Sequence, residues 1–91
     1  NERMAMNLYK LLNQLGISIP EDISVIGFDN YAMISELLEP GLTTVELPYA
    51  KIGKNGGQKL LKFIRGEKVN PGSMVENISG NVVWRNSVKT N

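Results

Sequence analysis

Residues 19–30 read IPEDISVIGFDN, and this stretch decides how the chain folds. Its central part, ISVIGF at 23–28, is rich in β-branched and aromatic side chains and is apolar almost without interruption. Such a run predicts a strand buried on both faces, as in a parallel sheet. The strand ends on Asp29 and Asn30, and two explanations are open. The pair either caps the next turn or binds a polar ligand at the strand's carboxyl end.

Helical and extended segments follow one another on both sides of this strand. A helix that Gly16 ends is predicted before it, because apolar residues recur there at the spacing of one helical face. Those residues are Met4, Leu8, Leu11, Leu12 and Leu15. The elements expected after the strand are a helical turn within 31–41, a strand at 42–47, a helix at 49–65, a loop at 67–73, and strands at 74–78 and 81–88. This order is typical of an α/β protein, and the lack of a strand before the first helix leads us to expect a piece of a longer protein.

The composition narrows the classes of function. The 91 residues include ten Lys and Arg, nine Asp and Glu, no histidine and no cysteine, and the net charge is +1. The basic residues are scattered and do not form the positive face typical of a DNA-binding domain. Because the commonest general base, metal ligand and thiol nucleophile are missing, we predict no catalytic residue, no metal site and no cofactor. No apolar run approaches the roughly 20 residues of a membrane helix, so no membrane contact is predicted.

Three further features have both a structural and a functional explanation. The glycines of GKNGG at 53–57 lack the spacing of a phosphate-binding loop, so we expect them to allow close packing against a neighbour. Trp84 is expected in the core or in an interface rather than against a ligand. The apolar residues of the first helix and of segment 31–38 exceed what two short elements need for one core. They are therefore either buried or part of a subunit contact.

Several motifs together resemble one protein family. The motifs NERMA at 1–5, PEDISVIGFD at 20–29, LTTV at 42–45 and VVWRNSV at 82–88 resemble the effector-binding domain of LacI/GalR transcription regulators. The similarity extends over essentially all of the chain and corresponds to the C-terminal part of that domain. It implies an α/β architecture of the type I periplasmic-binding-protein-like fold. In that fold two three-layer α/β/α lobes are joined by crossover strands, and a small molecule binds in the cleft between them.

The resemblance also implies how the chain is divided. About 1–46 and 81–88 would belong to the lobe distal from DNA, and about 47–78 to the DNA-proximal lobe. The DNA-binding headpiece of the family is absent from these residues. We therefore expect a fragment that samples both lobes and completes neither.

Individual site residues follow from the same resemblance. Asp29 matches the family's acidic residue that binds effector hydroxyls or polar ring atoms, and Asn1 matches an amide that reaches the same ligand. Asn30 keeps its interpretation as a cap. Family members often carry Gln where this chain has Leu47, so no ligand contact is carried over to that position. The first helix and segment 31–42 match the family's dimerisation surface, which favours a subunit contact for Met4, Leu8, Met33, Leu37 and Leu38.

The function implied by the resemblance is that of a cytoplasmic regulator. A sugar-like effector in the cleft would favour one arrangement of the lobes and, through a homodimer, change how the absent headpieces bind operator DNA. The alternative is a periplasmic sugar-binding component of a transporter, which shares the fold. A preceding helix-turn-helix segment would support the regulator, and a signal peptide would support the transporter component.

Overall fold

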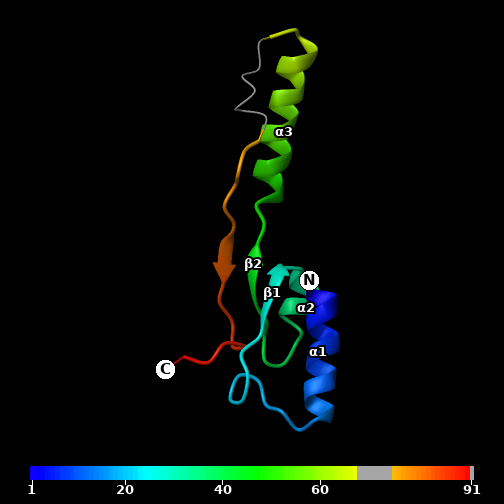
Figure 1. The fold of residues 1–91 in the computed structure, drawn as a ribbon, viewed down its shortest axis with the longest axis vertical. Coiled ribbons are helices and arrows are strands. Elements are labelled where there is room, and N and C mark those ends of the chain that lie inside the picture. Colours follow the sequence, from blue (N-terminus) through cyan, green and yellow to red (C-terminus); the bar gives the residue numbers. More distant parts are fainter. Residues whose placement is uncertain (68–74, 91) are drawn as a thin grey trace. The chain divides into compact units, whose positions relative to one another are not determined.

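The structure is a computed structural model that describes residues 1–67 and 75–90 (Figure 1). The chain separates into two compact units. The first unit joins Asn1–Leu47 with the segment from Gly80 onward, and the second is Pro48–Ser79. The assignment of these units to two lobes of a larger domain stays a prediction.

The first unit begins with helix α1, Glu2–Gln14. Asn1 is its N-cap, because the side-chain oxygen accepts a hydrogen bond of 3.0 Å from the Met4 backbone N–H. Gly16, at a φ of 71°, follows the helix in the left-handed conformation that glycine adopts without strain. The predicted helix and its end are thus confirmed. Of the predicted apolar face only Leu12 is buried, together with Ala5 and Tyr9, whereas Met4, Leu8, Leu11 and Leu15 are exposed.

Three strands form the sheet of the first unit, as far as the chain is described. They are β1 (Ile26–Asp29), β2 (Thr43–Glu46) and β3 (Asn81–Val83), in the order β1-β2-β3. β1 and β2 are parallel, with Ile26 opposite Thr43, and β2 and β3 are antiparallel. Along the chain, the short helix α2, Ala32–Ser35, follows β1 and precedes β2. The predicted strand at 74–78 is wrong for residues 75–78, which form no strand. Met74 lies outside the described residues.

The core of this unit lies between α1 and one face of the sheet. It consists of Ala5, Tyr9, Leu12, Val25 and Leu42, with Ile17, Ile19 and Leu38 packed against it. The opposite face of β1 is exposed: Ile26 is 59% and Phe28 52% accessible. The prediction that β1 is buried on both faces is therefore wrong for this chain, because α1 covers only the face that carries Val25 and Gly27. Trp84 is also exposed, so it does not belong to the core.

The second unit consists mainly of helix α3, Tyr49–Ile64, which confirms the second predicted helix. Glu76 holds the segment after it, since its carboxylate accepts a hydrogen bond from Asn55 and forms an ion pair of 3.0 Å with Lys59. Lys59 lowers the pKa of Glu76. Within the described residues nothing lies within 4 Å of a Cβ placed at any glycine of 53–57, so the close packing predicted there is not found. Most of the predicted loop at 67–73 lies outside the described residues.

Across the described parts of the chain, neither long helix has the length and apolarity that crossing a bilayer requires.

Candidate functional site

The candidate site lies at the carboxyl end of β1, where Asp29 is the last residue of the strand. Asp29 has a φ of 101° and Asn30 a φ of 55°, so two successive residues other than glycine occupy the positive-φ region. Such a backbone costs about 1–3 kcal/mol per residue and persists only where the surroundings fix it. The interactions that fix it here involve residues distant in the sequence.

Glu2 makes the first of these interactions. Its side chain is buried, at 2% exposure, although it lies in the first turn of α1. One carboxylate oxygen, Oε2, accepts a hydrogen bond of 2.9 Å from the Tyr31 backbone N–H. The other, Oε1, accepts one of 2.8 Å from the Thr44 hydroxyl. The Thr44 oxygen in turn accepts a hydrogen bond of 3.2 Å from the Asn30 backbone N–H.

Arg85 makes the second group of these interactions. Its Nη2 donates to the side-chain oxygen of Asn30 at 2.9 Å, and its Nη1 donates to the Leu42 carbonyl at 2.7 Å. The Arg85 backbone N–H donates to the Thr43 hydroxyl at 2.9 Å. The side chain of Asn30 is thus bound to Arg85.

The interpretation of Asp29-Asn30 as a helix cap is wrong. The N-cap of α2 is Tyr31, whose side chain makes no cap hydrogen bond. The amide oxygen of Asn30 accepts from Arg85. The ligand-binding role of Asp29 stays a prediction.

Asn1 is brought to the same end of the sheet, because Glu2 connects the start of α1 to the segment after β1 (Figure 1). Its side-chain oxygen is used as the cap of α1. Its role toward a ligand stays a prediction. Glu2, Thr44 and Arg85 are the residues at this site that sequence reasoning missed. Glu at position 2 could have been noticed only from its contacts, since an acid in a first helical turn is ordinary.

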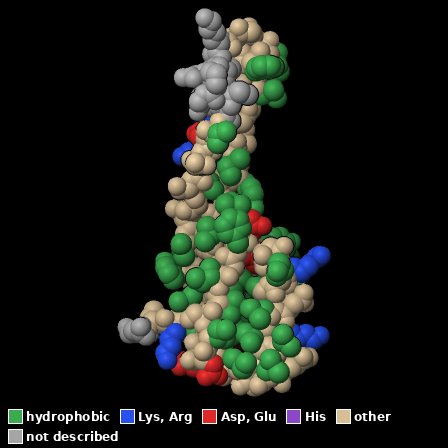
Figure 2. Space-filling model, viewed as in Figure 1, with side chains coloured by type: hydrophobic (Ala, Val, Ile, Leu, Met, Phe, Trp, Pro, Cys, Tyr) green, Lys and Arg blue, Asp and Glu red, His purple; other side chains and the backbone are tan. Residues whose placement is uncertain are grey.

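The predicted dimer residues lie on the surface of the first unit, apart from one. Met4, Leu8, Met33 and Leu37 are exposed, with Leu37 reaching 82%, whereas Leu38 is partly buried against the core. Figure 2 shows hydrophobic side chains on the surface of this unit, among side chains of other types. Their role in a subunit contact stays a prediction.

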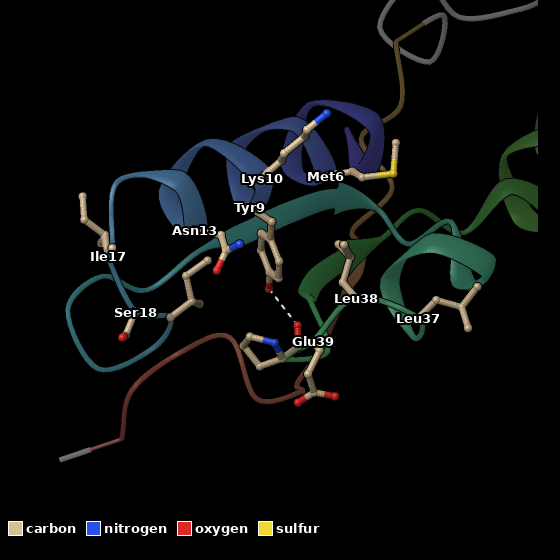
Figure 3. Close-up of a pocket in the computed structure, with 12 residues that line it drawn as sticks. Met6, Tyr9, Lys10, Asn13, Ile17, Ser18, Leu37, Leu38 and Glu39 are labelled. Carbon is tan, nitrogen blue, oxygen red and sulfur yellow. Dashed lines mark hydrogen bonds between the residues drawn. The ribbon is translucent and has the colours of Figure 1, made fainter.

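A groove of about 560 Å³ lies beside these residues, between α1 and segment 37–40 (Figure 3). Tyr9 points into it from α1 and donates a hydrogen bond of 2.9 Å to the Pro40 carbonyl. Burial raises the pKa of the Tyr9 hydroxyl, and the carboxylate of Glu39 raises it further, while a hydrogen bond with Ser87 lowers it. The hydrogen bond from Tyr9 to Pro40 connects α1 to the segment that follows α2.

The described residues contain no group of three or more Asp and Glu side chains that could hold a metal ion.

Comparison with known proteins places this arrangement in a family. The periplasmic binding protein-like domain matches residues 1–88. The repressor PurR of Vibrio atlanticus is 41% identical over 90 residues, which are 99% of this chain and 26% of that protein. A LacI family transcriptional regulator from Arthrobacter sp. FB24, in complex with lactose, is 30% identical with a TM-score of 0.80 over 94% of this chain and 32% of its own. The Lac repressor dimer bound to operator is 25% identical with a TM-score of 0.83 over 99% of this chain and 30% of its own.

The chain thus spans only about a quarter to a third of the length of these proteins. All three are transcription regulators rather than transporter components. The chain belongs to the family of periplasmic binding protein-like domains, and within it to the effector-binding domains of LacI/GalR regulators.

Proposed function

We propose that the protein containing this chain is a ligand-sensing transcription regulator in which Asp29 binds the effector. One observation carries this proposal: Asp29 ends β1 in a positive-φ backbone, and the backbone N–H groups of the next two residues are hydrogen-bonded to Thr44 and Glu2. Backbone strain of this kind gathers at ligand-binding sites. Ligands of open α/β sheets bind beyond the carboxyl ends of the strands, where Asp29 lies.

The proposed effector is a sugar or a related metabolite. An ionised carboxylate accepts up to about four hydrogen bonds, which suits neighbouring hydroxyl groups. The related Arthrobacter regulator is in complex with lactose. Asn1 would contribute its amide from the start of α1. In this proposal the domain binds its effector and carries out no catalysis.

The proposed mechanism is a shift between two arrangements of lobes. The first unit would belong to the lobe distal from DNA and the second to the DNA-proximal lobe. Effector binding would favour one arrangement by no more than its difference in affinity for the two. In a cytoplasmic homodimer, this shift would alter operator binding by headpieces outside this chain. The related Lac repressor, which is a dimer bound to operator, supports this proposal.

The test is a thermal-shift screen of the full-length regulator against D-ribose, lactose, sucrose, ribose 5-phosphate and adenine. A compound that binds the folded state raises the melting temperature by mass action. Asp29→Ala should then weaken binding of that compound by about 1.5–3 kcal/mol, the range for hydrogen bonds to a charged group. Asp29→Asn keeps a residue that tolerates positive φ, so an equal loss in both variants would identify the charge. Unchanged affinity in both variants, measured by calorimetry, would rule out the ligand role.

A further inference from the structure

Glu2 is a buried carboxylate that the proposed effector contact does not use. An acid in the first turn of a helix is stabilised by the helix dipole, but this stabilisation requires no burial. Burial of a carboxylate is costly unless its oxygens are hydrogen-bonded. At 2% exposure, Glu2 therefore depends on the partners that its two oxygens find.

Those partners are the Tyr31 N–H and the Thr44 hydroxyl, and through them Glu2 reaches both residues that follow Asp29. The Tyr31 N–H binds Glu2 at 2.9 Å. The Asn30 N–H binds the Thr44 hydroxyl at 3.2 Å, and that hydroxyl binds Glu2 at 2.8 Å. One carboxylate thus fixes two successive backbone amides, one directly and one through a single hydroxyl group. The backbone immediately after Asp29 is thereby held, and with it the positive φ of Asp29.

The strand itself is shaped to admit this carboxylate. A Cβ at Gly27 would lie 3.0 Å from Oε1 of Glu2. A side chain at this position would press on the Glu2 carboxylate, which would have to shift by a few tenths of an ångström, and Gly27 lies two residues before Asp29 in β1. The carboxylate is thus packed against the strand that carries Asp29 and bonded to the segment that follows it.

We propose that Glu2 is a positioning residue for effector binding. It touches no ligand; it keeps residues 29–31 in the backbone geometry that presents the Asp29 carboxylate at the strand end. This inference rests on the proposed function, since it assumes that Asp29 binds the effector. When Glu2 is substituted, residues 29–31 spend a smaller fraction of the time in the binding geometry. The apparent affinity for the effector falls in proportion to that fraction.

The test is the isosteric substitution Glu2→Gln in the full-length regulator. An amide carries no charge and offers one oxygen and a donor NH₂: with the oxygen on the Tyr31 N–H, the NH₂ faces Thr44, and the Thr44 hydroxyl proton loses its acceptor. The binding assay uses whichever of D-ribose, lactose, sucrose, ribose 5-phosphate or adenine binds the wild type. We expect about tenfold weaker binding, the effect of a segment that is competent roughly a tenth of the time. Glu21→Gln, an exposed glutamate of the same unit, is the matched control and should leave the affinity unchanged.

A double-mutant cycle separates positioning from general stability. If Glu2 acts through Asp29, Glu2→Gln should weaken binding tenfold in the wild type and less than about twofold in an Asp29→Ala background. Amide exchange at Tyr31 should also accelerate in Glu2→Gln and not in Glu21→Gln. Should Glu2→Gln fail to fold, Thr44→Val removes the hydroxyl and is expected to show the same coupling.

The outcomes distinguish this inference from the proposed function. If Asp29→Ala weakens binding but folded Glu2→Gln or Thr44→Val does not, the positioning role is wrong and the proposed function stands. An equal loss in both backgrounds also overturns positioning, because it indicates a general structural effect. If no compound of the panel binds, or Asp29→Ala binds like the wild type, the proposed function itself fails.

Discussion

Gly27 offers the sharpest test of the packing beneath the site. A Cβ at this position would lie 2.7 Å from Cδ2 of Leu42 and 3.0 Å from Oε1 of Glu2. Carbon atoms in contact prefer about 3.5–4.0 Å, so Leu42 would have to move by roughly 1 Å. Leu42 is fully buried in the core, so its movement would press on other core side chains. Overpacking of this kind costs about 1–3 kcal/mol, against about 0.5–1 kcal/mol gained by removing a glycine from a strand. We expect Gly27→Ala to destabilise the first unit by about 1–2 kcal/mol.

The assay is urea unfolding of the full-length regulator, followed by far-UV circular dichroism. Gly53→Ala is the control, because Gly53 lies inside α3 and nothing described is within 4 Å of the added methyl group. That variant should gain about 0.5–1 kcal/mol from the lower entropy of the unfolded chain and the better helix propensity of alanine. The two substitutions are chemically identical and should shift the unfolding transition in opposite directions. A Gly27→Ala variant as stable as Gly53→Ala would refute the packing described for Glu2 and Leu42.

Three more predictions concern the rest of the first unit. Leu37→Lys places a charge on an 82% exposed side chain, so it should leave stability within about 0.5 kcal/mol but shift the regulator toward monomer in sedimentation; an unaltered dimer would contradict the subunit contact. Because the folded-state pKa of Tyr9 is raised, its contribution to stability is complete below the ordinary pKa and declines as the pH rises above it. Tyr9→Phe should remove this alkaline decline in melting temperature and cost about 0.5–1.5 kcal/mol at neutral pH by loss of the hydrogen bond to Pro40. Gly80→Ala should weaken the β2–β3 pairing, since the methyl group would meet the backbone oxygen of Glu46, and slower exchange of β3 amides than in the wild type would speak against this.

The helices α1 and α3 and the strands β1 and β2 could be predicted because each has a local cause. The end of α1 depends on Gly16, and the strands depend on β-branched runs, which are visible along the sequence. The buried face of α1 could not be predicted in this way. Tyr9 is buried because its hydroxyl reaches the Pro40 carbonyl, 31 residues away, whereas the more apolar Leu8 and Leu11 stay exposed.

The strand pattern misled for a related reason. An apolar run predicts burial on both faces only if a second layer covers the sheet. α1 covers one face, and Ile26 and Phe28 on the other face are exposed in this chain. The apolar run therefore indicates that the strand is suited to burial on both faces. Whether both faces of β1 are buried depends on which elements of the chain cover them.

The candidate site also has one part that the local sequence predicts and one part that it does not. Asp29 attracts notice because a carboxylate ends an apolar strand, which is a local contrast. The residues that hold it do not, since Glu2 is 27 positions earlier and Arg85 is 55 positions after Asn30. Glu2 and Arg85 reach the end of β1 only because the fold brings three distant segments together. Hydrogen bonds between residues so far apart in the sequence leave no local sequence pattern. A ligand-binding acid can thus be anticipated from one strand, whereas the groups that keep it in a strained backbone become apparent only in the folded unit. For this reason Glu2→Gln and Thr44→Val, rather than further changes at Asp29, are the substitutions that examine how the site is built.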